Sequence, residues 1–494
     1  LNGSASNVEV DSTLKGAIVD LPIPARKSAT ESMPLKIERR VTAPDRDMIA
    51  ASYGRLGRLV IDRRLSDSGA VAERALLSLG TMTGEPERRG LSVRGEVDAV
   101  DFDGWLVLKD QLGTDADELP LSGLDVSVGM LDVFGRGFSD LHVSATRAGS
   151  DWQFDLRGRE VAGTGRWQAA APGRPGGRLT ARLQRFMTPE PAALANPTPS
   201  AKLENGVTSP WPAIDIVADS FTAKGHELGK LQLLAQPSDT DWRIESVTLT
   251  NDDGKLEATG WWHSGRRSQQ TELDAKLDVR DAGGYLARFG LPDAISGASA
   301  QLHGQVAWAG SPQDFDYPSL NGKFNIDTGP GHFIKLDPGM GKLLGVLSLQ
   351  SLKRRLSFDY KDVFGEGFAF DELTGDVRIQ DGVMKSDNLK ITGPAARISI
   401  SGEADIARET QNLKIHVLPT LSSGLSLGAA ALMFANPIVG AAIGAGSLLA
   451  QKALSDPFEQ MFASDYVVSG AWSDPQVERT KRVQTAEPVD GLRR

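Results

Sequence analysis

The feature that most constrains the fold of this chain is an alternation of apolar and polar residues with a period of two. It recurs in windows along most of the sequence, such as Leu124, Val126 and Val128, and later Ile398 and Ile400. Successive side chains of a strand point to opposite faces of a sheet, so this alternation predicts strands with one buried face. Gly or Asp-Gly lies close to many of these windows, as is typical of hairpin turns. The sequence therefore predicts a mostly β fold in which antiparallel strands follow one another.

The same alternation predicts strand structure around Asp103-Gly104. Leu91, Val93 and Val97 alternate with polar residues before this dipeptide, and Phe102, Leu106 and Leu108 flank it. We expect these residues to belong to strands joined by a turn.

An internal repeat supports a sheet built from similar units. The segment from Leu141 to Ala145, followed by Asp151-Trp152, aligns without a gap onto Leu231 to Ala235, followed by Asp241-Trp242. A second tryptophan then follows a glycine in both copies, and a looser third copy runs from Phe364 to Gly402. Repeats on this scale indicate one sheet extended by stacking β units. A set of separate β-sandwiches remains an equal alternative on the pattern alone.

Changes in composition divide the chain into six regions. We expect β repeats over 1–188, a Pro-rich linker or loop over 189–212, further β structure over 213–416, an apolar helical segment over 417–456, a terminal strand over 457–478 and a polar tail over 479–494. Asp474-Pro475 is expected to end the terminal strand.

The apolar segment differs from the rest of the chain. No charged residue occurs from Val417 to Gln451, and Asn436-Pro437 divides this stretch into halves that are each too short for a spanning helix, which needs about 20 residues. We expect a Gly/Ala-rich helical hairpin, either packed as a plug into the open end of the sheet or dipping into a membrane. Under the membrane interpretation the contact residues are Leu425, Leu432, Phe434, Ile438, Val439, Leu448 and Leu449.

No pattern of residues indicates catalysis or a cofactor. The six histidines are scattered singly, and without cysteine the chain has no disulfides and no thiolate metal sites. Gly339-Met340-Gly341-Lys342 lacks the first glycine and the final Ser or Thr of a phosphate-binding loop. The net charge of −10 comes from interspersed acids and bases, so nucleic acid is not an expected partner. We expect no enzyme, no metal and no cofactor.

The order of several short motifs resembles the AsmA-like C-terminal module of the YhdP family. These motifs are Leu320-Asn321-Gly322, Gly329-Pro330-Gly331-His332, the run from Gly339 to Ser348, the run from Leu352 to Asp359, Gly393-Pro394-Ala395 and the ending from Tyr466 to Pro475. Leu14-Lys15-Gly16 and Asp281-Ala282-Gly283 also look like this family. The resemblance covers most of the chain and is strongest from Asp281 onward.

The resemblance implies a long curled sheet that forms an open hydrophobic groove and carries phospholipid across the periplasm between the inner and outer membranes. It also implies an inner-membrane anchor outside this sequence, which begins at Leu1 without a leader and is expected to be a fragment. The alternation predicts the lipid-binding residues that line the groove: Leu141, Val143, Leu231, Leu233, Val377, Ile379, Leu389, Ile391, Ile398 and Ile400. One alternative stays open, a non-enzymatic envelope assembly or scaffold protein whose sheet closes on itself. An enzyme rival, a glycan-modifying β-repeat protein, would need clustered acids and exposed aromatic residues on one face, and the sequence does not show them.

Overall fold

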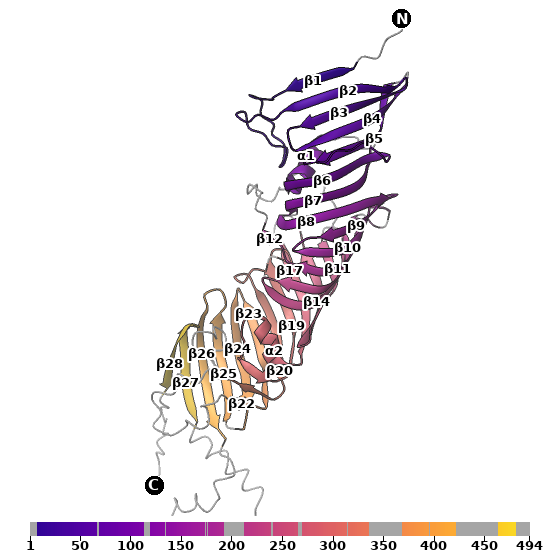
Figure 1. The fold of residues 1–494 in the computed structure, drawn as a ribbon. Helices are drawn as coiled ribbons and strands as arrows, with labels where there is room; N and C mark the ends of the chain where they lie inside the picture. Colours follow the sequence, from indigo (N-terminus) through magenta and orange to yellow (C-terminus); the bar gives the residue numbers. More distant parts are fainter. Residues whose placement is uncertain are drawn as a thin grey trace, which may run out of the picture. The chain divides into compact units, whose positions relative to one another are not determined.

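The computed structural model consists mainly of β-strands, and the residues that it describes include two short helices (Figure 1). Neighbouring strands are hydrogen-bonded to one another. The structure describes residues 7–66, 69–112, 119–133, 135–172, 174, 176–191, 212–238, 241–264, 269–313, 315–334, 368–394, 396–420 and 463–480. Two units are distinguished, Leu1–Thr240 and Asp241–Arg494, called here the N-terminal and the C-terminal unit.

The N-terminal unit contains a mixed sheet. Its elements are β1 (Val8–Ser12), β2 (Leu35–Ala43), β3 (Arg46–Tyr53), β4 (Gly57–Ser66), β5 (Gly69–Leu79), β6 (Gly90–Asp101), α1 (Phe102–Leu112), β7 (Leu121–Val133), β8 (Arg136–Ala148), β9 (Asp151–Arg157), β10 (Val161–Gln168), β11 (Arg178–Met187), β12 (Glu190–Pro191), β13 (Ala213–Ala223) and β14 (His226–Ser238). Most neighbours are antiparallel, but β5 pairs with β6, β6 with β7 and β11 with β13 in parallel. A parallel pair needs a crossover connection, so these pairings require longer connections than a hairpin turn.

The helix α1 corrects the strand expected around Asp103-Gly104. The side chain of Asp101 accepts a hydrogen bond from the backbone N–H of Gly104 (2.8 Å), which is the pattern of an N-terminal helix cap. The indole N–H of Trp105 donates to the carbonyl of Ile23 (3.0 Å) and attaches the helix to the loop before β2. Because β6 and β7 are parallel, the chain has to return along the sheet between them, and α1 lies in this connection.

The described strands of the C-terminal unit pair only in antiparallel fashion. Its elements are β15 (Asp241–Thr250), β16 (Gly254–His263), β17 (Gln270–Val279), α2 (Ala282–Arg288), β18 (Ile295–Gly297), β19 (Ala300–Ala309), β20 (Asn321–Thr328), β21 (Gly331–Phe333), β22 (Phe368–Phe370), β23 (Glu372–Gln380), β24 (Val383–Thr392), β25 (Ala396–Asp405), β26 (Thr410–Pro419), β27 (Ser464–Ala471) and β28 (Asp474–Thr480). Strands β18, β21 and β22 form a separate small sheet. The others pair in sequence order, so the extended-sheet alternative, and not two facing sheets of similar size, describes this fold.

The end of the chain differs from the expected boundaries. β26 continues to Pro419, past the expected start of the apolar segment at residue 417. Asp474-Pro475 begins β28 and does not end the sheet, so the expected terminal strand is a hairpin. Among the described strands β28 pairs only with β27, and proline is tolerated on such an edge strand because its missing N–H interrupts no second pairing. The expected membrane-contact residues, from Leu425 to Leu449, lie outside the described residues.

The sequence repeat corresponds to repeated structure. β8 and β14 are each 13 residues long and begin at equivalent positions of the two copies. Leu141 and Ala145 in β8, like Leu231 and Ala235 in β14, are buried. The two tryptophans of each copy lie opposite one another on neighbouring strands: Trp152 opposite Trp167, and Trp242 opposite Trp262.

Candidate functional site: the apolar sheet faces

The register of the N-terminal sheet places four of the expected lipid-binding residues on one face. Paired residues of neighbouring strands point to the same side, so a face can be followed from partner to partner. From Val143 in β8 this path runs through Leu156, Gly163, Leu183 and Ala218 to Leu231 in β14. Leu141 and Leu233 lie two positions away on the same strands and share this side, called here the N-terminal apolar face. His142 and Gln232 lie on the opposite face.

The exposure of these four residues differs along each strand. Leu141 and Leu231 are buried, at 4% and 6% exposure, whereas Val143 and Leu233 are half-buried. Of these four residues, the half-buried pair is therefore the part that a bound molecule could contact directly.

The other six expected residues share one face of the C-terminal sheet. Ile391 lies opposite Leu373 and Ile398, and Leu389 lies opposite Ile400. Val377 and Ile379 follow Leu373 at even spacing in β23, so they point to the same side, called here the C-terminal apolar face. Arg378 lies on the other face. Its opposite residues on the two neighbouring strands are Lys323 and Lys385.

Protein side chains cover much of the C-terminal apolar face. Ile391, Ile398 and Ile400 pack in one cluster with Phe333 and Phe370, whose ring centroids are 4.7 Å apart. These phenylalanines come from β21 and β22 of the small sheet. The helix α2, capped by a hydrogen bond from the Gly283 N–H to the side chain of Asp281, contributes Ala282 to the same cluster.

A second cluster involves the remaining buried residues of this face. Val377 and Ile379 pack with Trp308 and Leu320. The alternation does not predict the cover over the first cluster, because β18, β21 and β22 are only three residues long and show no alternation that could be recognised.

The N-terminal apolar face also carries an ionic group, formed by Arg39, Asp47 and Arg63. Tyr53 pairs with Gly57, and the path through Leu79, Gly95 and Val126 leads to Val143. Asp47 lies at even spacing from Tyr53 in β3, so Asp47 is on this face. Arg63 is the partner of Asp47 on β4, and Arg39 is the partner of Ile49, two positions from Asp47, so both arginines are on this face as well. Asp47 has 0% exposure and accepts hydrogen bonds from Nε of Arg39 (2.6 Å) and from Nε and Nη2 of Arg63 (2.9 and 2.7 Å).

Asp47 should make the stability of the N-terminal unit depend on pH. Burial raises the pKa of Asp47, but hydrogen bonds from Arg63 and Arg39 outweigh it and hold the pKa below its ordinary value. A lowered folded-state pKa gives stability that is present above the unfolded pKa of about 3.9 and is lost as the pH falls through the folded value. We expect Asp47→Asn to destabilise the unit at pH 6, and the difference from wild type to shrink at pH 3. Urea unfolding at both pH values measures this, and an equal difference at both would contradict it.

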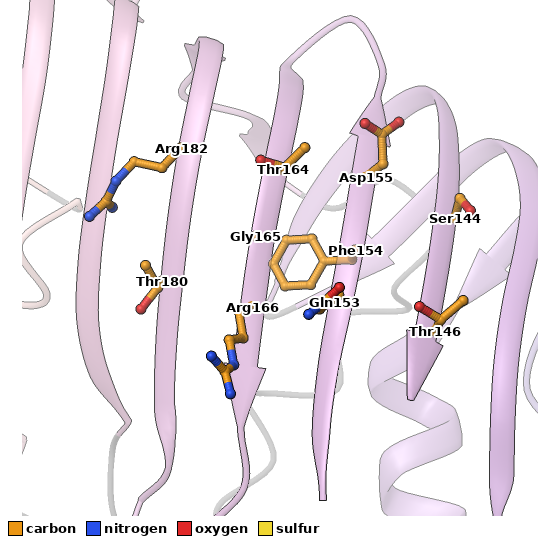
Figure 2. A pocket seen from close by; sticks show the side chains of 10 residues that line it. All are labelled: Ser144, Thr146, Gln153, Phe154, Asp155, Thr164, Gly165, Arg166, Thr180 and Arg182. Carbon is orange, nitrogen blue, oxygen red and sulfur yellow. The ribbon is translucent and has the colours of Figure 1, made fainter. Parts of the chain in front are cut away.

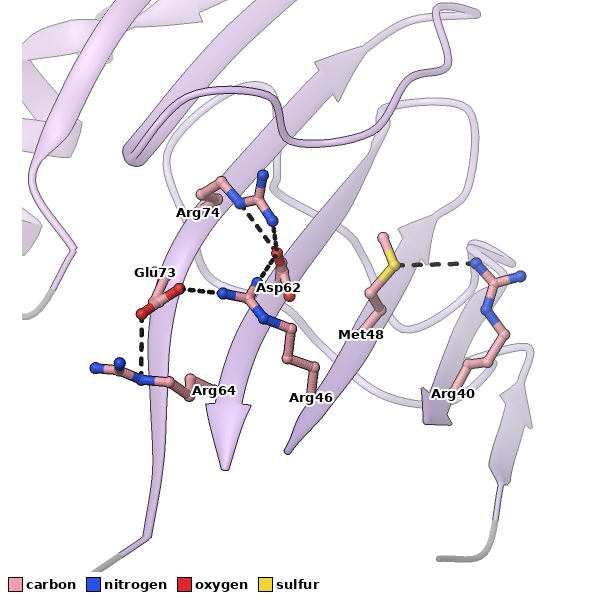
Figure 3. A network of polar contacts seen from close by, with 7 residues as sticks. All are labelled: Arg40, Arg46, Met48, Asp62, Arg64, Glu73 and Arg74. Atoms are coloured by element: carbon pink, nitrogen blue, oxygen red, sulfur yellow. Dashed lines mark hydrogen bonds and ion pairs between the residues drawn. The ribbon is translucent and has the colours of Figure 1, made fainter. Parts of the chain in front are cut away.

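A second ionic cluster lies on the opposite face of the same strands (Figure 3). Asp62 accepts from Arg46 (3.0 Å) and from Arg74, and Glu73 accepts from Arg46 (2.7 Å) and pairs with Arg64 (3.2 Å). Both carboxylates therefore have at least two guanidinium partners.

A pocket on the polar face of the N-terminal sheet offers no unpaired charge. Figure 2 shows its lining, which comprises Ser144, Thr146, Gln153, Phe154, Asp155, Thr164, Gly165, Arg166, Thr180 and Arg182. Arg166 is paired with Asp151 (2.6 Å), Arg182 with Asp215 (2.8 Å) and Asp155 with Arg157 (2.8 Å). These pairs join neighbouring strands or positions on one strand, and their role is structural.

The histidines on the polar faces are also paired with carboxylates. His416 lies 2.6 Å from Asp465 and His263 lies 2.8 Å from Asp241. Within the residues that the structure describes, no three potential metal ligands come together.

Comparison with known proteins identifies the family. The family model described as "YhdP protein" matches residues 1–477. The chain belongs to the YhdP family. A curated relative, the "Intermembrane phospholipid transporter YhdP" of Escherichia coli (strain K12), is 26% identical over 97% of this chain. The chain spans 38% of the length of that relative. No solved structure matches the chain.

The resemblance of the motifs to the YhdP family is thus confirmed, and it extends to the N-terminal unit. Neither described helix is long and apolar enough to cross a membrane.

Proposed function

We propose that this chain carries phospholipid along the apolar faces of its sheets, as part of a path through the periplasm between the inner and outer membranes. The observation that carries the proposal is the strand register. In each sheet the predicted lipid-binding residues lie on one face, and the polar or charged residues between them in sequence lie on the other. The name of the Escherichia coli relative supports phospholipid as the cargo.

The chemistry of the N-terminal apolar face suits acyl chains. Burying one methylene group of a lipid tail is worth about 0.8 kcal/mol, and this gain needs no directional contact. A lipid bound in this way can move along the face in small steps, since neighbouring strands offer similar apolar side chains. Such transport requires no covalent chemistry, and we propose no enzymatic activity.

The covered C-terminal apolar face favours a second function, that of a scaffold whose sheet face closes on itself. Ile391, Ile398 and Ile400 are at most 5% exposed and pack against side chains of this chain. We propose that lipid contacts mainly Val143 and Leu233, and that it reaches Ile391 or Ile398 only when β21 and β22 move away from the large sheet.

Mass spectrometry of the protein purified without detergent tests the proposal. We expect phospholipid to copurify with the chain in at least stoichiometric amount, because a wet apolar face would otherwise be exposed. The control is a soluble protein of similar net charge that passes through the same columns. Absence of lipid from the purified chain, together with no uptake from phospholipid vesicles, would favour the scaffold.

A further inference from the structure

The Arg39–Asp47–Arg63 group leaves one positive charge on the N-terminal apolar face. Two guanidinium groups converge on one carboxylate, and arginine stays protonated at any physiological pH. Arg63 alone satisfies both oxygens of Asp47, through Nε to Oδ1 (2.9 Å) and Nη2 to Oδ2 (2.7 Å). Asp47 therefore does not need Arg39 to complete its hydrogen bonds.

Several donors of this group point away from Asp47. Arg39 bonds Asp47 only through Nε, and its two Nη atoms make no hydrogen bond to another described residue. Nη1 of Arg63 likewise makes none among the described residues. The side chains of Arg39 and Arg63 are 36% and 24% exposed, so a bound molecule can reach part of each side chain from solvent.

Apolar side chains flank the charged group. Arg39 lies between Val8 in β1 and Ile49 in β3, which are its partners on the two neighbouring strands. Val8 and Val10 are 50% and 49% exposed on this face. A positive charge with free N–H groups beside exposed apolar side chains matches a ligand with an anionic end and an apolar end.

We propose that Arg39 and Arg63 bind the phosphodiester of a phospholipid headgroup, with the acyl chains on the adjoining apolar residues. Guanidinium groups bind phosphate oxygens through paired N–H donors, and Asp47 holds the two groups together without cancelling their charge. The single net positive charge equals the charge of one phosphodiester. This assignment rests on the proposed lipid transport and adds where a headgroup is held.

The test compares two short-chain lipids that differ in the phosphate. Dihexanoyl phosphatidylglycerol carries the phosphodiester, and dihexanoylglycerol has the same acyl chains without it. The measured quantity is the ratio of their dissociation constants for the whole chain, obtained by calorimetry. A charge-assisted bidentate contact at a partly exposed site should give wild type a preference of about tenfold for the phospholipid.

Arg39→Gln should remove this preference, because Asp47 keeps both of its bonds to Arg63 and the net positive charge is lost. Arg39→Lys retains the charge and should keep most of the preference. The matched control is Arg64→Gln, which removes the same charge at the next position to Arg63 but on the opposite face, within the cluster of Figure 3. It should leave the ratio unchanged.

Any of five results would overturn the assignment. An unchanged ratio in Arg39→Gln would exclude a role for Arg39, and an equal loss in Arg64→Gln would attribute the effect to overall charge. Inorganic phosphate that binds as tightly as the phospholipid would indicate a site for free phosphate. Binding of neither lipid to wild type would overturn both this assignment and the proposed function, whereas binding of both without preference would overturn the assignment alone.

Discussion

A photocrosslinking residue at Val143 or Leu233 is expected to capture phospholipid at least about tenfold more efficiently than one at His142 or Gln232. A tenfold ratio corresponds to about 1.4 kcal/mol, less than the gain from burying one apolar side chain against a lipid tail. The compared positions are sequence neighbours on the same strands, so only the face differs. Mass spectrometry of the crosslinked chain, prepared with phospholipid vesicles, gives the readout.

A charged side chain on the N-terminal apolar face should interrupt the movement of lipid along that face. Leu233→Asp is expected to reduce lipid capture at Val143, because an unpaired carboxylate on an apolar path has to be desolvated whenever a tail passes. Gln232→Asp places the same charge on the exposed opposite face and serves as the control. Equal capture at all four crosslinking positions would show that the face assignment is wrong.

Shortening Ile391 to alanine is expected to destabilise the C-terminal unit by about 2–5 kcal/mol. Ile391 is 1% exposed and belongs to the cluster that includes Ile398, Phe333 and Phe370, so the shorter side chain would leave a cavity between the large sheet and its cover. Hydrogen exchange of the β24 and β25 amides in increasing urea measures the local free energy of opening.

The control for this variant is Lys390→Ala, one position away and exposed on the other face, which should change the same quantity by less than about 0.5 kcal/mol. If Ile391→Ala costs no more than Lys390→Ala, the small sheet does not hold Ile391 in a packed core. Ile391 would then be open to lipid in the same way as Leu233.

The alternation was enough to predict which residues share a face, but not what covers that face. In β8, β14 and β25 the period of two is regular, and the expected sides agree with the observed register. Small sheets such as β18, β21 and β22 are held by packing between segments distant in sequence, which leaves no local pattern. The helix α1 was missed because its apolar residues also fit a broken strand pattern, and only the parallel pairing of β6 and β7 requires a crossover there.

The candidate residues were predictable for the same reason, and the ionic group was not. Leu231 and Leu233 follow from alternation, whereas Arg39, Asp47 and Arg63 interrupt it at positions where apolar residues are expected. A single charged residue in such a pattern is usually read as a surface position, so the sequence does not indicate that these three side chains meet. Their proximity depends on the pairing of β2 with β3 and of β3 with β4.

From β23 to β26 each strand is hydrogen-bonded to the next strand in the chain. A sheet with this connectivity can gain or lose whole hairpins between related sequences. A complete hairpin inserted there would lengthen the sheet by about 10 Å, twice the spacing between strands. Because two strands are added together, the direction of every later strand and the face of every later side chain are preserved. Duplication of hairpins is therefore a route by which a chain of this kind could lengthen its sheet while keeping the same apolar face.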